Sequence, residues 1–179
     1  MANEGGEWIM KGLDWDDPYR IRSWRELISW INEVGFLPLF ANARRDGYDF
    51  DAAWDDALIQ RRYKAIMDIC EDGEMHPGYE LKPAAGFGKE GYKNFDGCMT
   101  QLQMQTYLII RKFERRRNRR GQSYGMAVSF YQKPEVLWGY EHVTSAYKEE
   151  PELSGERIIA RAKELFPGAS DEAFRRVLR

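Results

Sequence analysis

The residues from Pro77 to Tyr131 constrain the fold most, because helical and strand-like patterns follow one another there in a fixed order. A short apolar segment, 79–85, precedes a Gly-rich turn and an amphipathic stretch, 94–106. Apolar and polar residues then alternate in 107–113 and again in 124–131, and a basic loop, 114–123, joins these two segments. The order helix, turn, helix, strand, loop, strand is that of a helix-turn-helix with a β-hairpin wing.

The second helix, predicted over 94–105, has one apolar and one polar face. The apolar positions recur every three or four residues, so we expect them to pack on a helix predicted over 51–71; they are Phe95, Met99, Leu102 and Thr106. Asn94 suits the N-cap. The opposite face consists of Lys93, Gly97, Thr100, Gln101 and Met104. Thr and Gln side chains can hydrogen-bond base edges or phosphates, although an ordinary solvated helix face would look similar.

Positive charge is concentrated between the two alternating segments. Residues 111–121 read RKFERRRNRRG, with six Arg and one Lys against one Glu. Residues 93–123 hold eight basic and two acidic residues, net +6, whereas the whole chain is −2, so the remainder is −8. Because the planar guanidinium binds phosphate through two parallel hydrogen bonds, we predict that this hairpin tip holds phosphates. The alternatives are a solvated loop and a loop that meets an acidic protein partner. The arginines are Arg111, Arg115, Arg116, Arg117, Arg119 and Arg120.

The flanking sequence is predominantly helical in pattern. Ser23–Glu26 is a capping box that predicts a helix over 24–34, followed by a buried apolar run at 36–40 and a polar turn at 43–49. Beyond the hairpin, Pro134 is expected to open a helix that Pro151 breaks, and Ser154 and Ser170 are expected to cap two more. We predict a mainly α protein with a small β-hairpin: a winged helix-turn-helix at 76–132, an N-terminal helical region at 1–75 and a C-terminal helical tail at 133–179.

Composition and motifs exclude several classes of protein. Two cysteines give no disulfide framework, and neither a signal sequence nor an apolar run of membrane-spanning length is found, so we predict a cytoplasmic protein with no membrane association. Gly86-Phe87-Gly88 lacks the remainder of a dinucleotide motif, and the histidines and cysteines have no metal-ligand spacing. We therefore expect no cofactor and no metal. The acidic cluster 14–17 could be catalytic or metal-binding, but such clusters more often cap a helix or face water.

Several stretches of the chain resemble the AlkZ-related winged-helix family, relatives of the bacterial glycosylases that unhook DNA interstrand crosslinks. They lie between residues 11 and 152 and read KGLDWDDPYRIRSW, INEVGFLPLFAN, RRDGYDFDAAWDD, ELKPAAGFGKEGYKNFDG, LQMQTYL and LWGYEHVTSAYKEEPE. The resemblance implies a winged-helix fold and a connection with DNA repair. The chain departs from the family between Leu39 and Ala43, where it lacks a Trp-rich segment.

The resemblance also raises the possibility of catalysis, because the active glycosylases use a Gln-x-Gln or Gln-x-Asp pair. Gln101 and Gln103 have that spacing. On a helix, however, residues two apart point about 160–200° away from each other, so the two amides would not converge. We therefore predict that Gln101 faces DNA and that Gln103 points to the flank of the helix.

Three functions follow in order of preference. The first is binding of nucleic acid, most simply duplex DNA, with helix 94–105 against a groove and the wing arginines on phosphates. The second is a glycosylase-like enzyme that acts on damaged or crosslinked DNA by base flipping, for which the sequence offers only weak pocket candidates: Asp14, Trp15, Asp16 and Trp54. The third is a protein-interaction module with a basic wing.

Overall fold

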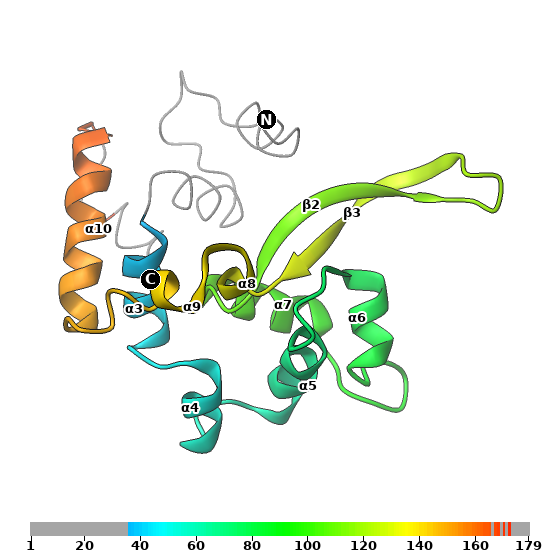
Figure 1. Ribbon diagram of the computed structural model, residues 1–179, viewed down its shortest axis with the longest axis horizontal. Helices are drawn as coiled ribbons and strands as arrows, with labels where there is room; N and C mark the ends of the chain where they lie inside the picture. Colours follow the sequence, from blue (N-terminus) through cyan, green and yellow to red (C-terminus); the bar gives the residue numbers. More distant parts are fainter. Residues whose placement is uncertain (1–35, 166, 169, 171, 173–179) are drawn as a thin grey trace. The chain divides into compact units, whose positions relative to one another are not determined.

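The computed structural model describes residues 36–165 together with 167, 168, 170 and 172 (Figure 1). The helix predicted at 24–34 and the acidic cluster 14–17 lie outside these residues, and of the helix predicted after Ser170 only residues 170 and 172 are described. Helices account for most of the regular secondary structure, beside one small antiparallel sheet of three strands. The chain forms two compact units: Tyr48–Tyr140 is one, and the described residues 36–47 and 141–165 belong to the other. The three-region division predicted from sequence stays a prediction.

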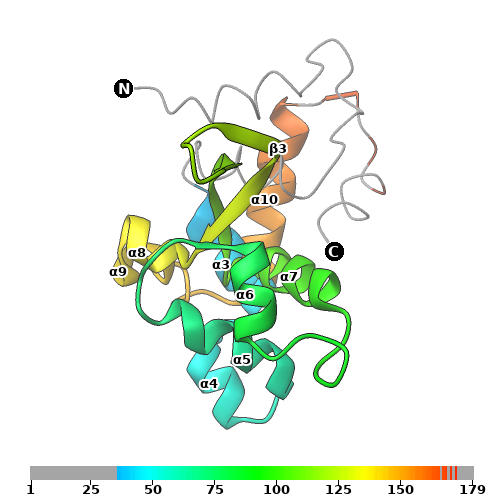
Figure 2. The same ribbon diagram turned by 90° about the vertical axis from the view of Figure 1, so that its right-hand side faces the viewer.

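The unit Tyr48–Tyr140 contains the predicted helix-turn-helix region. Its elements are α4 (Phe50–Asp55), α5 (Arg61–Cys70), β1 (His76–Pro77), α6 (Gly78–Ala84), α7 (Phe95–Met104), β2 (Ile109–Arg117), β3 (Ser123–Gln132) and α8 (Pro134–Trp138). The strands are antiparallel in the order β1-β3-β2. Figures 1 and 2 show α5, α6 and α7 gathered at one end of the β2–β3 hairpin, whose other end extends beyond them.

The apolar face predicted for the second helix is confirmed. Phe95, Met99 and Leu102 of α7 are buried in one core with Ile66 and Met67 of α5. The helix ends at Met104 because the carbonyl of Leu102 accepts hydrogen bonds from the amides of Tyr107 (2.9 Å) and Leu108 (3.2 Å), as the closing turn of a helix does. Thr106 therefore lies beyond the helix, with a left-handed backbone (φ 60°), but is buried as predicted.

The helix predicted over 51–71 is two short helices. Between α4 and α5, Ala57 has a left-handed backbone (φ 58°), and its amide donates to the carbonyl of Trp54 (2.9 Å). The amide of Leu58 donates to the carbonyl of Ala53 (2.9 Å) and its side chain is exposed. These bonds satisfy the last carbonyls of α4 and end the helix there. The helical spacing of apolar residues on both sides of the break made them resemble one continuous face.

The hairpin is confirmed, but its loop is shorter than predicted. Arg116 pairs with Tyr124 and Arg117 with Ser123, so strand pairing continues into the Arg-rich sequence and only residues 118–122 form the loop. The charge pattern suggested a loop over 114–123, yet backbone pairing tolerates adjacent arginines because successive side chains of a strand point to opposite faces.

The other unit packs α3 (Leu37–Arg45) against α10 (Pro151–Leu165). The apolar run 36–40 is the first turn of α3, so the polar turn predicted at 43–49 begins only after Arg45. Pro151 starts α10 rather than merely ending a preceding helix, because the first helical turn needs no amide hydrogen from proline.

The single helix predicted after Pro134 is divided at Gly139 (φ 83°) into α8 and the short α9 (Tyr140–Val143).

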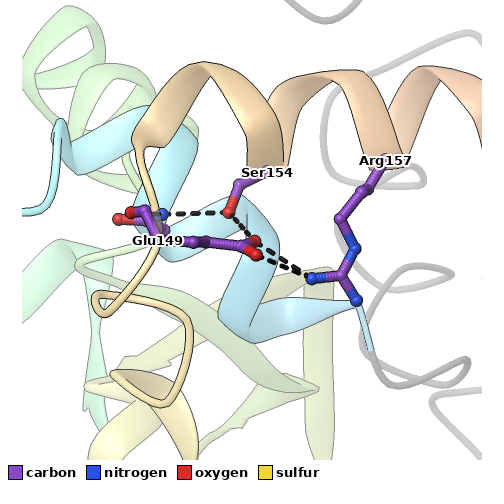
Figure 3. Close-up of polar contacts among 4 residues, drawn as sticks. Glu149, Ser154 and Arg157 are labelled. Atoms are coloured by element: carbon purple, nitrogen blue, oxygen red, sulfur yellow. Dashed lines mark hydrogen bonds and ion pairs between the residues drawn. The ribbon is translucent and has the colours of Figure 1, made fainter.

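Ser154 lies inside α10 and is not the N-cap that the sequence predicted. Its hydroxyl donates to Glu149 Oε1 (2.6 Å) and accepts a hydrogen bond from Asn42 Nδ2 (2.9 Å), which joins α10 to α3 (Figure 3). Arg157 forms an ion pair with the same carboxylate (2.9 Å). The hydrogen bond from Ser154, followed by the one from Arg157, lowers the pKa of Glu149. Because Asn42 and Ser154 are fully buried, this polar network stabilises the unit rather than offering a surface site.

None of the helices in the described part of the chain has the length and apolar character that crossing a membrane requires.

Candidate nucleic-acid interface

The tip of the hairpin is ordered by one side chain, that of Asn118. The side-chain Oδ1 accepts hydrogen bonds from the amides of Arg120 (2.9 Å) and Gln122 (3.0 Å). The backbone carbonyl of Asn118 accepts another from the amide of Gly121 (2.9 Å). Gly121 has a left-handed backbone (φ 75°), which glycine adopts without strain. Arg119 and Arg120 therefore occupy the corner of a defined turn, and both are exposed.

The arginines of β2 are divided between the two faces of the hairpin. Side chains alternate along a strand, so Arg115 and Arg117 share one face and Arg116 lies on the other with Lys112 and Glu114. Arg115, Arg117, Arg119 and Arg120 form no ion pair or side-chain hydrogen bond with any described residue. An exposed cation without an internal carboxylate partner keeps its charge and its donors available for an external anion.

Arg116 is positioned by an aromatic ring. Its guanidinium carbon lies 3.9 Å from the ring centroid of Tyr79 in α6. Stacking of this kind uses the flat face of the guanidinium and leaves its N–H groups, which lie at the edge, free to donate. The contact fixes Arg116 against α6 and prepares it for a planar, two-oxygen ligand such as phosphate or carboxylate.

Arg111 has a different environment from the other predicted arginines. It is the extra residue of a β-bulge, since Ile110 pairs with Tyr131 and Lys112 with Phe130. Its Nε donates to Gln132 Oε1 (3.0 Å), and Gln132 Nε2 donates in turn to the carbonyl of Gly73 (2.6 Å). Arg111 is half-buried and stabilises the base of the hairpin.

The one acidic residue of the Arg-rich segment is neutralised locally. Lys112 Nζ forms an ion pair with Glu114 (2.7 Å) and lies 4.5 Å from the ring centroid of Phe130. The hydrogen bond from Lys112 is the main cause of the lowered pKa of Glu114. Glu114 therefore stays ionised near neutral pH, with Lys112 as its ion-pair partner, and the charge of Arg117 makes a smaller contribution to the lowered pKa.

The predicted polar face of α7 is accessible, although several of its groups have internal partners. Thr100, Gln101 and Lys93 are exposed, whereas Gly97 and Met104 are half-buried. Lys93 Nζ donates to the carbonyls of Gly88 (2.7 Å) and Lys89, closing the loop before α7. Thr100 Oγ1 donates to the Asp96 carbonyl (2.9 Å).

Gly97 permits a close approach within the chain itself. A Cβ atom at this position would lie 2.3 Å from Asn94 Nδ2, so the side chain of Asn94 covers the glycine. Asn94 stands at the predicted N-cap position, but its backbone is left-handed (φ 61°) and its side chain makes no capping hydrogen bond. Gly97 therefore has a role in packing, besides any contact with a ligand.

Gln101 and Gln103 diverge, as the helical geometry requires. Gln101 is exposed, whereas Gln103 is buried and its Nε2 donates to the carbonyl of Met99 (2.7 Å). Gln103 thus lies deeper than the flank position predicted for it. The two amides do not form a common polar site in this structure.

The described residues include neither a cluster of metal ligands nor an activated thiol. No group of three His, Cys, Asp or Glu side chains that could hold a metal is found among them. Burial raises the pKa of Cys70 to about 12, with a smaller contribution from Asp72, and burial also raises the pKa of Cys98. Both thiols are therefore protonated and weakly nucleophilic at neutral pH.

The sequence alone did not indicate the role of Tyr79 on this surface, and it indicated the role of Asn118 only in part. Asn118 was recognised as a turn former, but its two backbone hydrogen bonds depend on the five-residue loop length. Tyr79 was assigned only to a short apolar segment. Its contact with Arg116 joins residues 37 positions apart, and no local pattern signals such a contact.

Comparison with known proteins gives one result. No curated protein and no solved structure matches the chain. A family model described as AlkZ related matches residues 36–179, so the N-terminal stretch KGLDWDDPYRIRSW precedes the matched region. Since that region covers well over half of the sequence, the chain belongs to the AlkZ-related family.

Proposed function

We propose that this protein binds duplex DNA through a winged helix formed by residues 76–132. In this proposal α7 lies in or against a groove, and the arginines of the hairpin hold phosphates on either side. The observation that carries the proposal is the set of four exposed arginines on one ordered hairpin whose side chains form no ion pair or hydrogen bond with a described residue. Family membership supports a role connected with DNA repair.

The order of the elements supports the winged-helix assignment. The chain runs α5, β1, α6, α7, β2, β3, and the short β1 adds to the hairpin on the side of β3. In a winged helix the second helix of the helix-turn-helix reads DNA and the hairpin flanks it, which here are α7 and β2–β3. The site residues remain those predicted from sequence, with Arg111 reassigned to the base of the hairpin.

A salt titration tests the proposal. Affinity for a duplex should fall with a log–log slope of about −0.9 per phosphate contact, because each contact releases condensed counterions. Replacing Arg115, Arg116, Arg117, Arg119 and Arg120 together by alanine should make the slope shallower by roughly 2–4 units. Arg161→Ala with Lys163→Ala, both exposed on α10, is the control for loss of positive charge elsewhere. An unchanged slope in the five-arginine variant would exclude the wing from the interface.

The glycosylase alternative is weakened by the divergence of Gln101 and Gln103. We therefore expect no release of bases from alkylated or crosslinked duplex under single-turnover conditions with protein in excess. Gln101→Ala should reduce affinity for duplex by about 1–3 kcal/mol if it contacts a base, and by less if it contacts phosphate. Base excision that both Gln101→Ala and Gln103→Ala abolish, with DNA binding intact, would make the enzyme the better account.

We also propose a cytoplasmic location. The support is that both cysteines are free and buried, since exported proteins commonly pair their cysteines in disulfides.

The remaining alternative is that the wing binds an acidic protein. In that case the protein should bind DNA no more tightly than it binds other polyanions.

A further inference from the structure

Exposed aromatic and apolar side chains lie among the cations of the hairpin, where phosphate binding alone would require only polar groups. Tyr124 is 50% exposed and Tyr79 of α6 is 41% exposed. Met126, in the bulge that follows Tyr124, is 88% exposed. Exposed rings beside exposed cations can contact a ligand that has a flat apolar surface as well as negative charge.

Tyr79 and Tyr124 both lie on the face of the hairpin that carries Arg116. Tyr124 is the direct cross-strand partner of Arg116, and the guanidinium of Arg116 lies over the ring of Tyr79. Neighbouring residues of a cross-strand pair project from the same face of the sheet. The ring of Tyr79 therefore contacts Arg116, and the side chain of Tyr124 projects from the same face of the hairpin beside it. The pKa of Tyr79 is raised, mainly by desolvation, with smaller contributions from Glu80 and Tyr124, which fits this proximity.

Nucleic acid with unpaired nucleotides has the chemistry that matches this face. The bases of an intact duplex are stacked on one another and present only their edges, whereas an unpaired base presents a flat π-face. Aromatic rings and guanidinium planes stack on such bases, and adjacent arginines bind the phosphates that connect them. Arg115, Arg117, Arg119 and Arg120 would supply these phosphate contacts from the opposite face and the tip.

We infer that Tyr79, Arg116 and Tyr124 form a stacking site for an unpaired base, so that the preferred ligand is a DNA duplex interrupted by unpaired nucleotides. This inference rests on the proposed function and specifies its substrate class. It assigns Arg116 to the base-stacking site, and Arg115, Arg117, Arg119 and Arg120 to the phosphate backbone.

The test compares two probes, an intact duplex and the same duplex with a short internal run of unpaired thymidines, at matched salt. The full chain should bind the interrupted probe more tightly, by roughly 5- to 140-fold, the range that corresponds to about 1–3 kcal/mol for one stacked base. Tyr124→Ala should remove most of this preference while leaving affinity for the intact duplex within about twofold and the salt slope unchanged. Tyr124→Trp should retain the preference, because it keeps a stacking surface.

Two further variants and one optical probe separate stacking from general damage. Tyr92→Ala removes a tyrosine of similar exposure (40%) from the loop before α7, and should leave both affinities unchanged. Tyr79→Ala should lower the preference, whereas Tyr79→Phe should preserve it. A 2-aminopurine in the unpaired run should change its fluorescence on binding to the wild type and not on binding to Tyr124→Ala.

The outcomes distinguish the inference from the function on which it depends. Salt-dependent binding of both probes with equal affinity, unaffected by Tyr124→Ala, overturns the stacking site and leaves duplex binding standing. Failure to bind either probe overturns both. Loss of the intact-duplex affinity in Tyr124→Ala, with a changed melting temperature, assigns the residue to folding and likewise overturns the inference.

Discussion

Replacing Leu102 by alanine should lower the free energy of unfolding by about 3–4 kcal/mol. Leu102 is 1% exposed and lies in the core that α7 shares with α5. The substitution removes three buried carbons, worth about 2.4 kcal/mol at about 0.8 kcal/mol each. A cavity left beside rigid neighbours adds to this, and buried leucines as a class cost about 2–5 kcal/mol.

Urea denaturation followed by circular dichroism measures the effect. The midpoint should fall while the dependence on urea concentration stays the same, because the surface exposed on unfolding hardly changes. Leu58→Ala is the matched control, since Leu58 is 63% exposed in the turn between α4 and α5 and should change stability by less than about 0.5 kcal/mol. Equal effects of the two substitutions would refute the burial of α7, and with it the outward orientation of Gln101.

Three other perturbations follow from the same structure. Gly97→Ala should change the free energy of unfolding by less than about 1 kcal/mol, because the gain in helix propensity offsets displacement of the flexible Asn94 side chain; a larger loss by chemical denaturation would show that Asn94 cannot move. Asn118→Ala should speed hydrogen exchange at the amides of Arg120 and Gln122, both of which lose an acceptor, and unchanged protection would show that the turn does not depend on Asn118. Between pH 9 and 12 the thiol of Cys70 should stay protonated in the folded protein and ionise in the unfolded one, so stability should fall as pH rises through this window. Cys70→Ser should flatten that part of the pH–stability curve, and an identical slope would contradict the raised pKa.

Local periodicity was sufficient where burial repeats along one element. The apolar positions Phe95, Met99 and Leu102 are spaced for a helix with a single buried face, and the structure buries all three. Alternation on either side of an Asn- and Gly-containing turn likewise predicted the hairpin. In both cases the information lies within a dozen residues, so one sequence carries it.

The same reasoning failed where backbone conformation or distant contacts decide the structure. The chain leaves α4 through Ala57, which has a left-handed backbone. Alanine rarely adopts this conformation, and no sequence pattern predicts it here. Pro151 was assigned to a helix break although proline is equally suited to a first turn, and Ser154 was assigned to a cap although Asn42 and Glu149 bind it inside the other unit's core. For the candidate interface, the charge pattern in the sequence located the arginines. Only the fold shows that Arg116 contacts Tyr79, that Arg111 donates to Gln132, and that the other arginines form no ion pair or side-chain hydrogen bond with a described residue.

Mapping of backbone amide chemical shifts during titration with duplex DNA tests the central claim most directly. The account predicts saturable shifts at the hairpin tip, residues 118–122, and at the exposed face of α7 around Thr100 and Gln101, with α10 unaffected. Raising the salt concentration should reverse these shifts together. Shifts confined to α3 and α10, or none at the hairpin while DNA binds, would contradict it.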